Sequence, residues 1–276
     1  GLPRKSGFGF FLLGCAMKVG VVGFGVFGQF LAKAFIRNGH EVIANSRADY
    51  TEVAKSLGVQ YFRSANDFAA QHPHCVLLCP AIISLDKVVQ SLPLDILLAH
   101  SLNGNYQRTL FVDVLSVKAY PKQLLQRVLP MEKCDLLCTH PMFGPQSGKD
   151  SWKGLPMVYE KVKIHDQTLC DEFLGVFEKE GCKMVEMTCE EHDRYAASSQ
   201  FITHTVGRAL SQLKLQSTPI NTKGYEQLLA VMNNTCSDSF DLYYGLYKYN
   251  QNSIDELERL IHALQAVKKQ LHDYDP

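Results

Sequence analysis

His140, in the stretch CTHPMFGPQSG, is the side chain best placed in this sequence for acid–base chemistry. It follows the apolar run CDLLC, which predicts a buried strand, and a loop with glycine and proline comes directly after it. A histidine with an ordinary pKa of about 6.5 can take a hydroxyl proton while hydride leaves the same carbon. Ser116, in DVLSVK after the preceding apolar run, can hydrogen-bond that hydroxyl or orient His140. The alternative is a structural histidine that caps its loop.

Gln200 and His204 are four residues apart in a segment that predicts a helix, so they share one face. That face can line a substrate site next to His140, although His204 taken alone is more typical of a satisfied core histidine. His192, near the start of the same helix, is interpreted as structural because the helix dipole disfavours a cation there.

Three glycines, Gly23, Gly25 and Gly28, form the pattern G-x-G-x-x-G between an apolar run and a predicted helix. In that context they permit a tight turn, the close approach of a pyrophosphate, and packing of helix on strand. The helix N-terminus then faces the anion, so the pattern predicts a dinucleotide site. A glycine-rich turn without ligand is the alternative. Further contacts with the nucleotide are expected from three residues: Phe27, Cys79 and Pro80.

The end of the second predicted strand indicates which dinucleotide binds. NAD sites usually carry Asp or Glu there, for the ribose 2′-hydroxyl. This sequence has Asn45-Ser46-Arg47 instead. Arginine can pair with a 2′-phosphate and serine can donate to it, so Ser46 and Arg47 predict NADP as the cofactor. The alternative is that Arg47 is a solvated surface charge.

Short apolar runs alternate with helical stretches from residue 18 onward. Strands are expected at 18–23, 41–45, 59–62, 74–79, 109–115, 134–140 and 182–187. Helices are expected at 26–38, 51–57, 84–91, 121–129 and 166–180, with a surface loop or insertion at 97–107. This rhythm predicts a parallel sheet covered by helices on both faces. The fold class is therefore α/β, with a doubly wound parallel sheet of the Rossmann type.

The C-terminal third is expected to be an all-helical domain. Possible capping boxes, Thr188 with Glu191 and Ser253 with Glu256, open two long helices, the first running to about residue 213. The second helix carries an apolar stripe: Ile254, Leu257, Leu260, Ile261, Leu264, Val267 and Leu271. The stripe belongs either to the core of the chain or to a homodimer interface. We expect a leader at 1–16, a nucleotide-binding domain at 17–187 and a helical substrate and dimerisation domain at 188–276.

The composition excludes several classes of partner. Lys plus Arg number 28 and Asp plus Glu number 28, so no net charge draws the chain to nucleic acid or to an anionic membrane. No apolar run is long enough to span a bilayer. The nine cysteines form no C-x-x-C pair, and Cys134 and Cys138 are better explained as reduced core thiols than as metal ligands with His140. We therefore expect a small-molecule substrate and no metal.

Five stretches together resemble the prephenate/arogenate dehydrogenase family, most closely its plant arogenate dehydrogenases: VGVVGFGVFGQFLAK, LFVDVLSVK, THPMFGPQSGKDSWKG, GCKMVEMTCEEHD and SSQFITHTVGRAL. The resemblance covers about residues 17–250. It implies oxidative decarboxylation of a cyclohexadienol, in which C4 gives hydride to the nicotinamide and the C1 carboxylate leaves as CO2. It also implies that His140 is the base, that Ser116 binds the substrate hydroxyl, that Gln200 and His204 line the substrate site, and that the helical domain forms a homodimer.

The resemblance leaves two substrates to distinguish. Arogenate carries an α-ammonium where prephenate has a ketone, and a facing carboxylate would pair with the ammonium and repel the more anionic prephenate. Thr235-x-x-Asp238-Ser239-Phe240-Asp241 resembles the plant pattern in which the first acidic residue is associated with arogenate. Asp238 therefore predicts arogenate as substrate and tyrosine as product, with prephenate as the alternative. Asp238 can instead cap a helix that begins near Ser239.

Two positions depart from the family pattern. Many bacterial members bind a substrate carboxylate with an arginine in the segment that here reads LYYGLYKYN, so Lys248 or a residue of a partner subunit would have to supply that contact. The loop after His140 has Gln146 where the common plant form has glutamate. Because no regulatory domain follows residue 276, inhibition by tyrosine is expected to be competitive at the active site.

Two other functions compete with this one. A β-hydroxyacid dehydrogenase would use a lysine base on the helix after the interdomain strand, and there is no lysine between residues 184 and 213. A non-enzymatic NADP-binding sensor would not need His140, Ser116 and His204 together. Plant relatives are often plastidic, but residues 1–16 are not a Ser- and Arg-rich transit peptide, so the sequence favours a cytoplasmic protein, with the plastid as the alternative.

Overall fold

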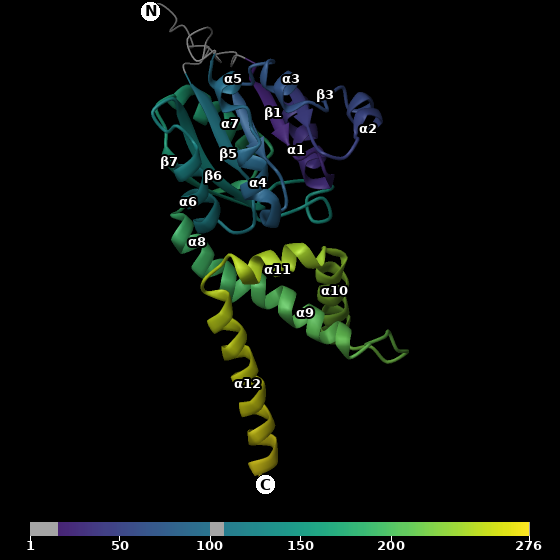
Figure 1. Ribbon diagram of the computed structural model, residues 1–276. Helices are drawn as coiled ribbons and strands as arrows, with labels where there is room; N and C mark the ends of the chain where they lie inside the picture. Colours follow the sequence, from purple (N-terminus) through teal and green to yellow (C-terminus); the bar gives the residue numbers. More distant parts are fainter. Residues whose placement is uncertain (1–15, 100–107, 276) are drawn as a thin grey trace, which may run out of the picture.

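The computed structural model describes residues 16–99 and 108–275. They form a sheet with helices on both faces and a layer of helices at one end of the sheet, from which the last helix projects (Figure 1). The expected leader lies outside the described residues except for Ala16, and so does the expected loop at 97–107 except for residues 97–99.

The sheet has the strand order β3-β2-β1-β4-β5-β6-β7-β8 within the described residues. Its strands are β1 (Lys18–Val22), β2 (Glu41–Asn45), β3 (Gln60–Phe62), β4 (Cys75–Leu78), β5 (Thr109–Asp113), β6 (Cys134–Pro141), β7 (Pro156–Lys163) and β8 (Lys183–Glu186). The first six are parallel, β7 runs antiparallel to β6, and β8 is parallel to β7. All seven expected strands and the doubly wound fold class are confirmed, and β7 is an addition that the sequence did not predict.

Helices cover the two faces of the sheet. They are α1 (Val26–Arg37), α2 (Thr51–Ser56), α3 (Ala65–Ala69), α4 (Leu85–Gln90), α5 (Leu94–Leu98), α6 (Ala119–Val128) and α7 (Gln167–Lys179). Phe35 and Phe173 of α1 and α7 lie in the core on one face, and Phe68 and Leu124 of α3 and α6 lie in the core on the other. Each such buried side chain contributes about 1.5–3 kcal/mol. Because α5 ends at Leu98, the start of the expected loop at 97–107 is in fact helical and buried.

The helical layer consists of α8 (Cys189–Ala196), a π-helical turn (Ala197–Phe201), α9 (Ile202–Gln212), α10 (Lys223–Ser237), α11 (Phe240–Lys248) and α12 (Ser253–Asp273). The capping box of Thr188 and Glu191 is confirmed. The one at Ser253 and Glu256 is wrong, because Asn252 precedes the helix and the Ser253 hydroxyl instead donates to the carbonyl of Leu246 at 2.8 Å. The helix nevertheless begins where the sequence placed it.

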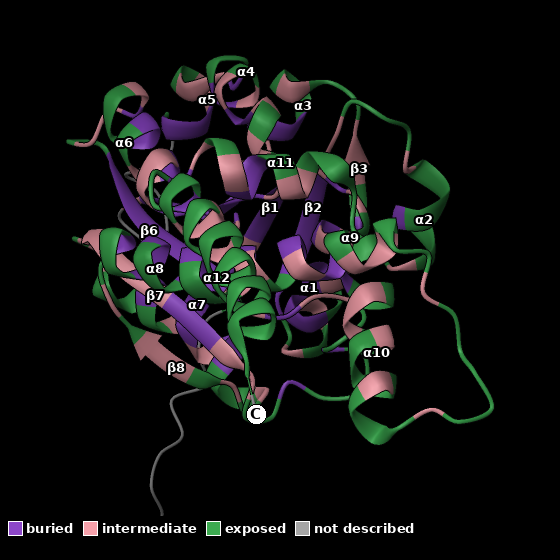
Figure 2. Ribbon diagram, turned by 90° about the horizontal axis from the view of Figure 1, so that it is seen from below, coloured by how far each residue is buried: buried purple, intermediate pink, exposed green. Residues whose placement is uncertain are grey.

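Most of the apolar stripe of α12 lies outside the core of the chain. Leu257, near the start of the stripe, packs against the buried cluster of Val117, Phe201 and Leu246. Further along, the exposed fractions reach 64% at Leu264 and 76% at Leu271, and α12 projects away from the other helices (Figure 1) and is coloured as exposed over most of its length (Figure 2). Of the two alternatives from the sequence, burial within the chain therefore holds only for the start of the stripe. No helix of the described residues has the length and apolar character needed to cross a membrane.

Candidate active site

The glycine loop joins β1 to α1 and leaves room for an anion. Gly23 has φ +96°, and a Cβ on it would lie 2.8 Å from the backbone of Cys79. A Cβ on Gly28 would collide with the carbonyl oxygen of Gly23, whereas a Cβ on Gly25 would meet nothing within 4 Å. Gly25 precedes α1, whose first turn has neither a side-chain cap nor an acidic residue. The first amides of α1 therefore suit a phosphate group.

Cys79 and Pro80, which follow β4, lie directly against this loop. The Cys79 amide donates to the carbonyl of Val22 at 2.8 Å. Burial, helped by Asp113, raises the pKa of the Cys79 thiol, so it stays protonated. Phe27 is half-buried in the first turn of α1, with its ring 6.1 Å from that of Phe30.

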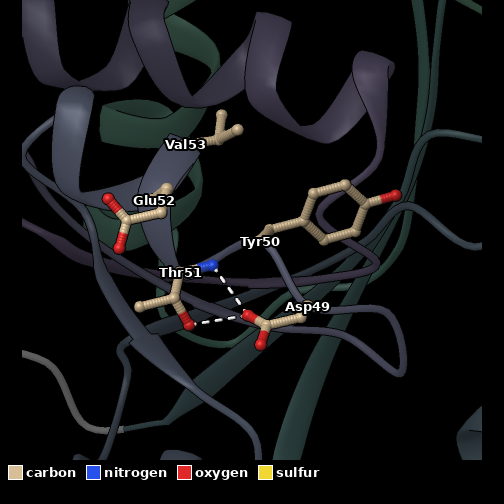
Figure 3. A pocket seen from close by; sticks show the side chains of 5 residues that line it. All are labelled: Asp49, Tyr50, Thr51, Glu52 and Val53. Carbon is tan, nitrogen blue, oxygen red and sulfur yellow. Dashed lines mark hydrogen bonds between the residues drawn. The ribbon is translucent and has the colours of Figure 1, made fainter.

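Arg47 is exposed just beyond the end of β2, and Ser46 is half-buried beside it. Next to them lies a hollow of about 340 Å³ lined by Asp49, Tyr50, Thr51, Glu52 and Val53 (Figure 3). The Asp49 carboxylate accepts hydrogen bonds from the Thr51 amide and hydroxyl, at 3.0 and 2.7 Å, and pairs with Arg63 at 3.2 Å. The hydrogen bonds from Thr51 lower the pKa of Asp49 most, with a smaller contribution from Arg63. The one carboxylate close to Arg47 in sequence is thus already engaged.

His140 is the penultimate residue of β6, at the carboxyl edge of the parallel strands, and is only 4% exposed. Its Nδ1 is 2.8 Å from Nε2 of His192. Burial holds the pKa of His140 well below its usual range, and His192 and the buried Lys118 ammonium lower it further. His140 is therefore neutral near pH 7, with Nε2 as the nitrogen left to accept a proton.

Lys118 is the cation behind this histidine. Its ammonium is buried, donates to the carbonyl of Thr139 at 2.6 Å and pairs with the carboxylate of Asp113. The Thr139 hydroxyl donates to the carbonyl of Asp113 at 2.7 Å, so the ends of β5 and β6 are tied together. The sequence analysis did not identify this cluster, because nothing next to Lys118 in the sequence distinguishes it from an ordinary surface lysine.

Ser116 is half-buried in the loop between β5 and α6. In the parts of the chain that the structure describes, the hydrogen bond of His140 goes to His192 and not to Ser116. The sequence had offered two roles for Ser116, and orienting His140 belongs to His192 instead. Contact with the substrate hydroxyl remains the role expected of Ser116.

Gln200 and His204 lie one turn apart, in the π-helical turn and α9, and both are largely buried. Gln200 Oε1 and His204 Nδ1 are buried and have no hydrogen-bond partner within residues 16–99 and 108–275. Burial lowers the pKa of His204, and the nearby Asp238 carboxylate opposes that shift. Two unsatisfied polar atoms on one helix face indicate a place for a polar ligand.

Asp238 follows α10, and its carboxylate is 3.8 Å from Nε2 of His204. Ser239, not Asp238, caps α11, because its hydroxyl accepts from the amide of Leu242 at 3.2 Å. The alternative that Asp238 serves as this cap is therefore wrong. The structure brings Asp238 and His204 together, with Gln200 four residues before His204, whereas Lys248 is exposed at the end of α11.

Arg208 is a residue that the sequence analysis missed. It lies one turn after His204, and its guanidinium donates to the carbonyl of Asp238 at 2.8 Å and lies 5.0 Å from the ring of Tyr243. Arg208 thus holds the backbone of Asp238 in place. The regular spacing of Gln200, His204 and Arg208 at four-residue intervals is the signal that would have identified it.

The two cysteines near His140 in sequence are core residues. Cys134 and Cys138 are free, buried thiols of β6, and Cys134 Sγ donates to the carbonyl of Pro130. The described residues contain no group of three side chains that could hold a metal ion.

A doubly wound sheet with an open glycine loop, a neutral buried histidine at its carboxyl edge and a helical second part defines the class of nucleotide-binding dehydrogenases. Two family models match the chain: "NADP oxidoreductase coenzyme F420-dependent" over residues 18–102 and "TYRAAT1-like, C-terminal domain" over residues 209–275. The chain is 55% identical to arogenate dehydrogenase 2, chloroplastic, of Arabidopsis thaliana over 260 residues, which cover 93% of this chain and 70% of that protein. The chain therefore belongs to the arogenate dehydrogenase family of oxidoreductases, which confirms the resemblance found in the sequence.

Other relatives agree with this assignment. Arogenate dehydrogenase 1, chloroplastic, of the same plant is 52% identical over 262 residues, covering 94% of this chain and 40% of that protein. A crystal structure of prephenate dehydrogenase from A. aeolicus with hydroxyphenyl propionate and NAD+ has a TM-score of 0.71 and covers 93% of this chain and 91% of its own. At 18% identity it supports the fold alone. Both plant relatives are named as chloroplastic, and neither name supports the cytoplasmic location expected from the sequence.

Proposed function

We propose that this protein is an NADP-dependent arogenate dehydrogenase, which converts arogenate to tyrosine with loss of CO2 in tyrosine biosynthesis. The observation that carries the choice of substrate is the carboxylate of Asp238, 3.8 Å from His204 on the face that also presents Gln200. A carboxylate there suits the α-ammonium of arogenate and disfavours the ketone and extra negative character of prephenate. The names of the two plant relatives support the same substrate.

His140 is proposed as the general base. Its Nδ1 is engaged by His192, so Nε2 accepts the proton of the substrate 4-hydroxyl. Its lowered pKa keeps this nitrogen unprotonated near pH 7. Ser116, half-buried at the neighbouring strand end, is proposed to hydrogen-bond the same hydroxyl. As the proton leaves, the C1 carboxylate departs as CO2 and its bonding electrons complete the aromatic ring.

The chain's residues fit NADP as the cofactor, which when bound supplies the hydride acceptor for C4 of the substrate. Gly25 leaves space above the first turn of α1, and Gly23, Gly28, Cys79 and Pro80 pack the loop so that this space stays open. Phe27 flanks the loop from α1. Ser46 and the exposed Arg47 would hold the 2′-phosphate, beside the hollow shown in Figure 3.

We assign different functions to the two parts of the chain. Residues 17–187 are proposed to bind the nucleotide, and residues 188–276 to bind the substrate with Gln200, His204 and Asp238 and to form a homodimer through the uncovered stripe of α12. The plastid is proposed as its location, in line with the named location of both plant relatives.

The test is turnover with each pair of substrates. Purified protein is given arogenate or prephenate, with NADP or NAD, and reduced nicotinamide is followed by its absorbance. The proposal expects turnover of arogenate with NADP to exceed the other three combinations. A preference for prephenate would overturn the role of Asp238 and keep that of His140, whereas no turnover with either substrate would favour a nucleotide-binding sensor.

A further inference from the structure

A buried chain of three side chains runs behind the proposed base. His140 Nδ1 is 2.8 Å from His192 Nε2, and His192 Nδ1 is 2.8 Å from Oδ1 of Asp193. The exposed fractions of His140, His192 and Asp193 are 4%, 3% and 3%. Water therefore does not compete for these two hydrogen bonds, and each must be satisfied by the side chains themselves.

The backbone around Asp193 fixes the direction of the hydrogen bonds. Oδ1 of Asp193 accepts from the amide of Lys118 at 2.8 Å, and Oδ2 accepts from the amide of Ala119 at 2.9 Å. The Asn250 side chain holds the carbonyl of Asp193 at 2.7 Å. The ammonium of Lys118 is engaged by Asp113 and Thr139. With both oxygens accepting from amides, the carboxylate is also the acceptor for His192, whose Nδ1 must carry the proton.

The carboxylate of Asp193 determines which ring nitrogen carries the proton, first in His192 and then in His140. A neutral His192 with its proton on Nδ1 has a lone pair on Nε2, so it accepts a hydrogen bond from His140. His140 then carries its own proton on Nδ1, and its lone pair is on Nε2. The opposite tautomer of His140 would place two lone pairs against each other across 2.8 Å in a buried site.

We propose that His192, oriented by Asp193, is a positioning residue that fixes His140 in the tautomer protonated on Nδ1 and so frees Nε2 to act as the base. The catalytic part of this inference rests on the proposed function, whereas the tautomer itself does not. The position of His192 supports a role in addition to packing, since a residue that only joined α8 to β6 would not need to accept a hydrogen bond at that nitrogen.

The first test measures the tautomer without any substrate. Protein with isotopically labelled histidine is studied by heteronuclear NMR, which distinguishes a proton on Nδ1 from one on Nε2, and His140 is assigned by loss of its signals in His140→Asn. We expect His140 to be protonated on Nδ1 in the wild type and to shift toward the Nε2 tautomer in His192→Leu. A wild-type His140 protonated on Nε2 would overturn the proposal, and this result does not depend on the folding of His192→Leu.

The second test separates positioning from simple packing. In His192→Gln the amide oxygen can accept from His140 and the amide nitrogen can donate to Asp193, whereas His192→Leu offers neither. We expect kcat to fall on the order of a hundredfold in His192→Leu, the scale of a general base that is wrongly protonated, and only a few-fold in His192→Gln. The KM values for substrate and NADP should change little, because His192 lies behind His140.

A matched control is available in His40→Gln. His40 is also a buried histidine, but it lies before β2 and accepts from the amide of Met17. The kcat of the His40→Gln protein should equal that of the wild type. Equal losses of kcat in His192→Gln and His192→Leu, with the tautomer unchanged, would overturn the positioning role. A protein inactive toward both substrates but with the expected tautomer would refute the proposed function and leave the tautomer assignment standing.

Discussion

At the scale of single residues, the proposed preference for arogenate depends on one negative charge. Asp238 is the acidic residue whose carboxylate lies beside His204, and Arg208 fixes its backbone. In Asp238→Asn the geometry is kept and the charge is lost. We expect kcat/KM for arogenate to fall about tenfold to a thousandfold, and kcat/KM for prephenate to rise, because a charged pair with the ammonium is replaced by a neutral contact.

Asp241→Asn provides the matched control for this prediction. Asp241 lies three residues further along, in the first turn of α11, and is exposed. Its replacement removes the same charge from the same segment without touching His204, so the ratio of the two kcat/KM values should stay close to that of the wild type. Equal effects of the two substitutions would show that the preference for arogenate comes from the total negative charge of the segment and not from Asp238 itself.

The proposed preference for NADP depends on one positive charge. Arg47→Ala should raise the KM for NADP about tenfold to a hundredfold, since a charged hydrogen bond to the 2′-phosphate is lost, and should leave the KM for NAD unchanged. Arg37→Ala is the control, because Arg37 is also exposed but pairs with Glu180 at the other end of α1. Steady-state kinetics with both nucleotides would measure these KM values. If the Arg47→Ala protein still favours NADP, groups other than Arg47 bind the 2′-phosphate.

The sequence indicated the proposed base more clearly than the residues that contact it. His140 was recognisable because a histidine at the end of an apolar run, before a glycine and proline loop, is informative in itself. His192 is 52 residues away and reaches His140 only because α8 crosses the end of β6. Arg208 and Lys118 likewise acquire their roles from contacts across the fold, and no local pattern records such contacts.

At the scale of elements, the missed strand and the missed turn have separate causes. In β7 only Met157 and Val158 are fully buried, so the strand lacks the apolar run by which its neighbours were recognised. The π-helical turn at 197–201 lies inside a segment that reads as one continuous helix. It inserts an extra residue between α8 and α9, and this residue rotates the side chains of α9 about the helix axis relative to those of α8. His192 can thus face β6, while His204 faces Asp238 and Tyr243.

The contact between α9 and α10 depends on a glycine. A Cβ at Gly207 would collide with the hydroxyl of Thr235, which donates to the carbonyl of Val231 at 2.9 Å. We expect Gly207→Ala to reduce the free energy of unfolding by about 1–3 kcal/mol, because the two helices must move apart. Chemical denaturation of the purified variant would measure it.

A double mutant tests whether this collision is the cause. Thr235→Ala removes the hydroxyl, so adding it to Gly207→Ala should recover part of the lost stability instead of adding a second loss. Strictly additive losses would show that Gly207 acts through something other than its contact with Thr235. The shape of the helical layer, and with it the approach of Asp238 to His204, would then need another explanation.

At the scale of the whole molecule, buried histidines make stability depend on pH. The pKa values of His40, His74, His140 and His204 are all lowered, chiefly by burial. Below about pH 6.5 the unfolded chain takes up protons on these residues that the folded chain does not. The free energy of unfolding should therefore fall as the pH drops from about 7.5 to about 5.5, by up to about 1.4 kcal/mol per pH unit for each histidine.

Denaturation midpoints across this range would measure the slope, and His40→Gln should reduce it by removing one of the four contributions. Stability that rises on acidification would contradict the assignment of these side chains as neutral in the folded state.

The projecting helix α12 gives the last prediction, which concerns assembly. Ile254, Ile261, Leu264 and Leu271 follow the spacing of a two-helix seam and are 39–76% exposed in the single chain. Such a stripe is stable in water when a second copy covers it. We expect a dimer in sedimentation experiments, and a monomer for Leu264→Glu with Leu271→Glu, because two charges would be buried in the seam. Gln270→Glu adds a charge on the opposite side of the same helix and should leave the dimer intact. A wild-type monomer at high concentration would mean that α12 is covered by a different partner.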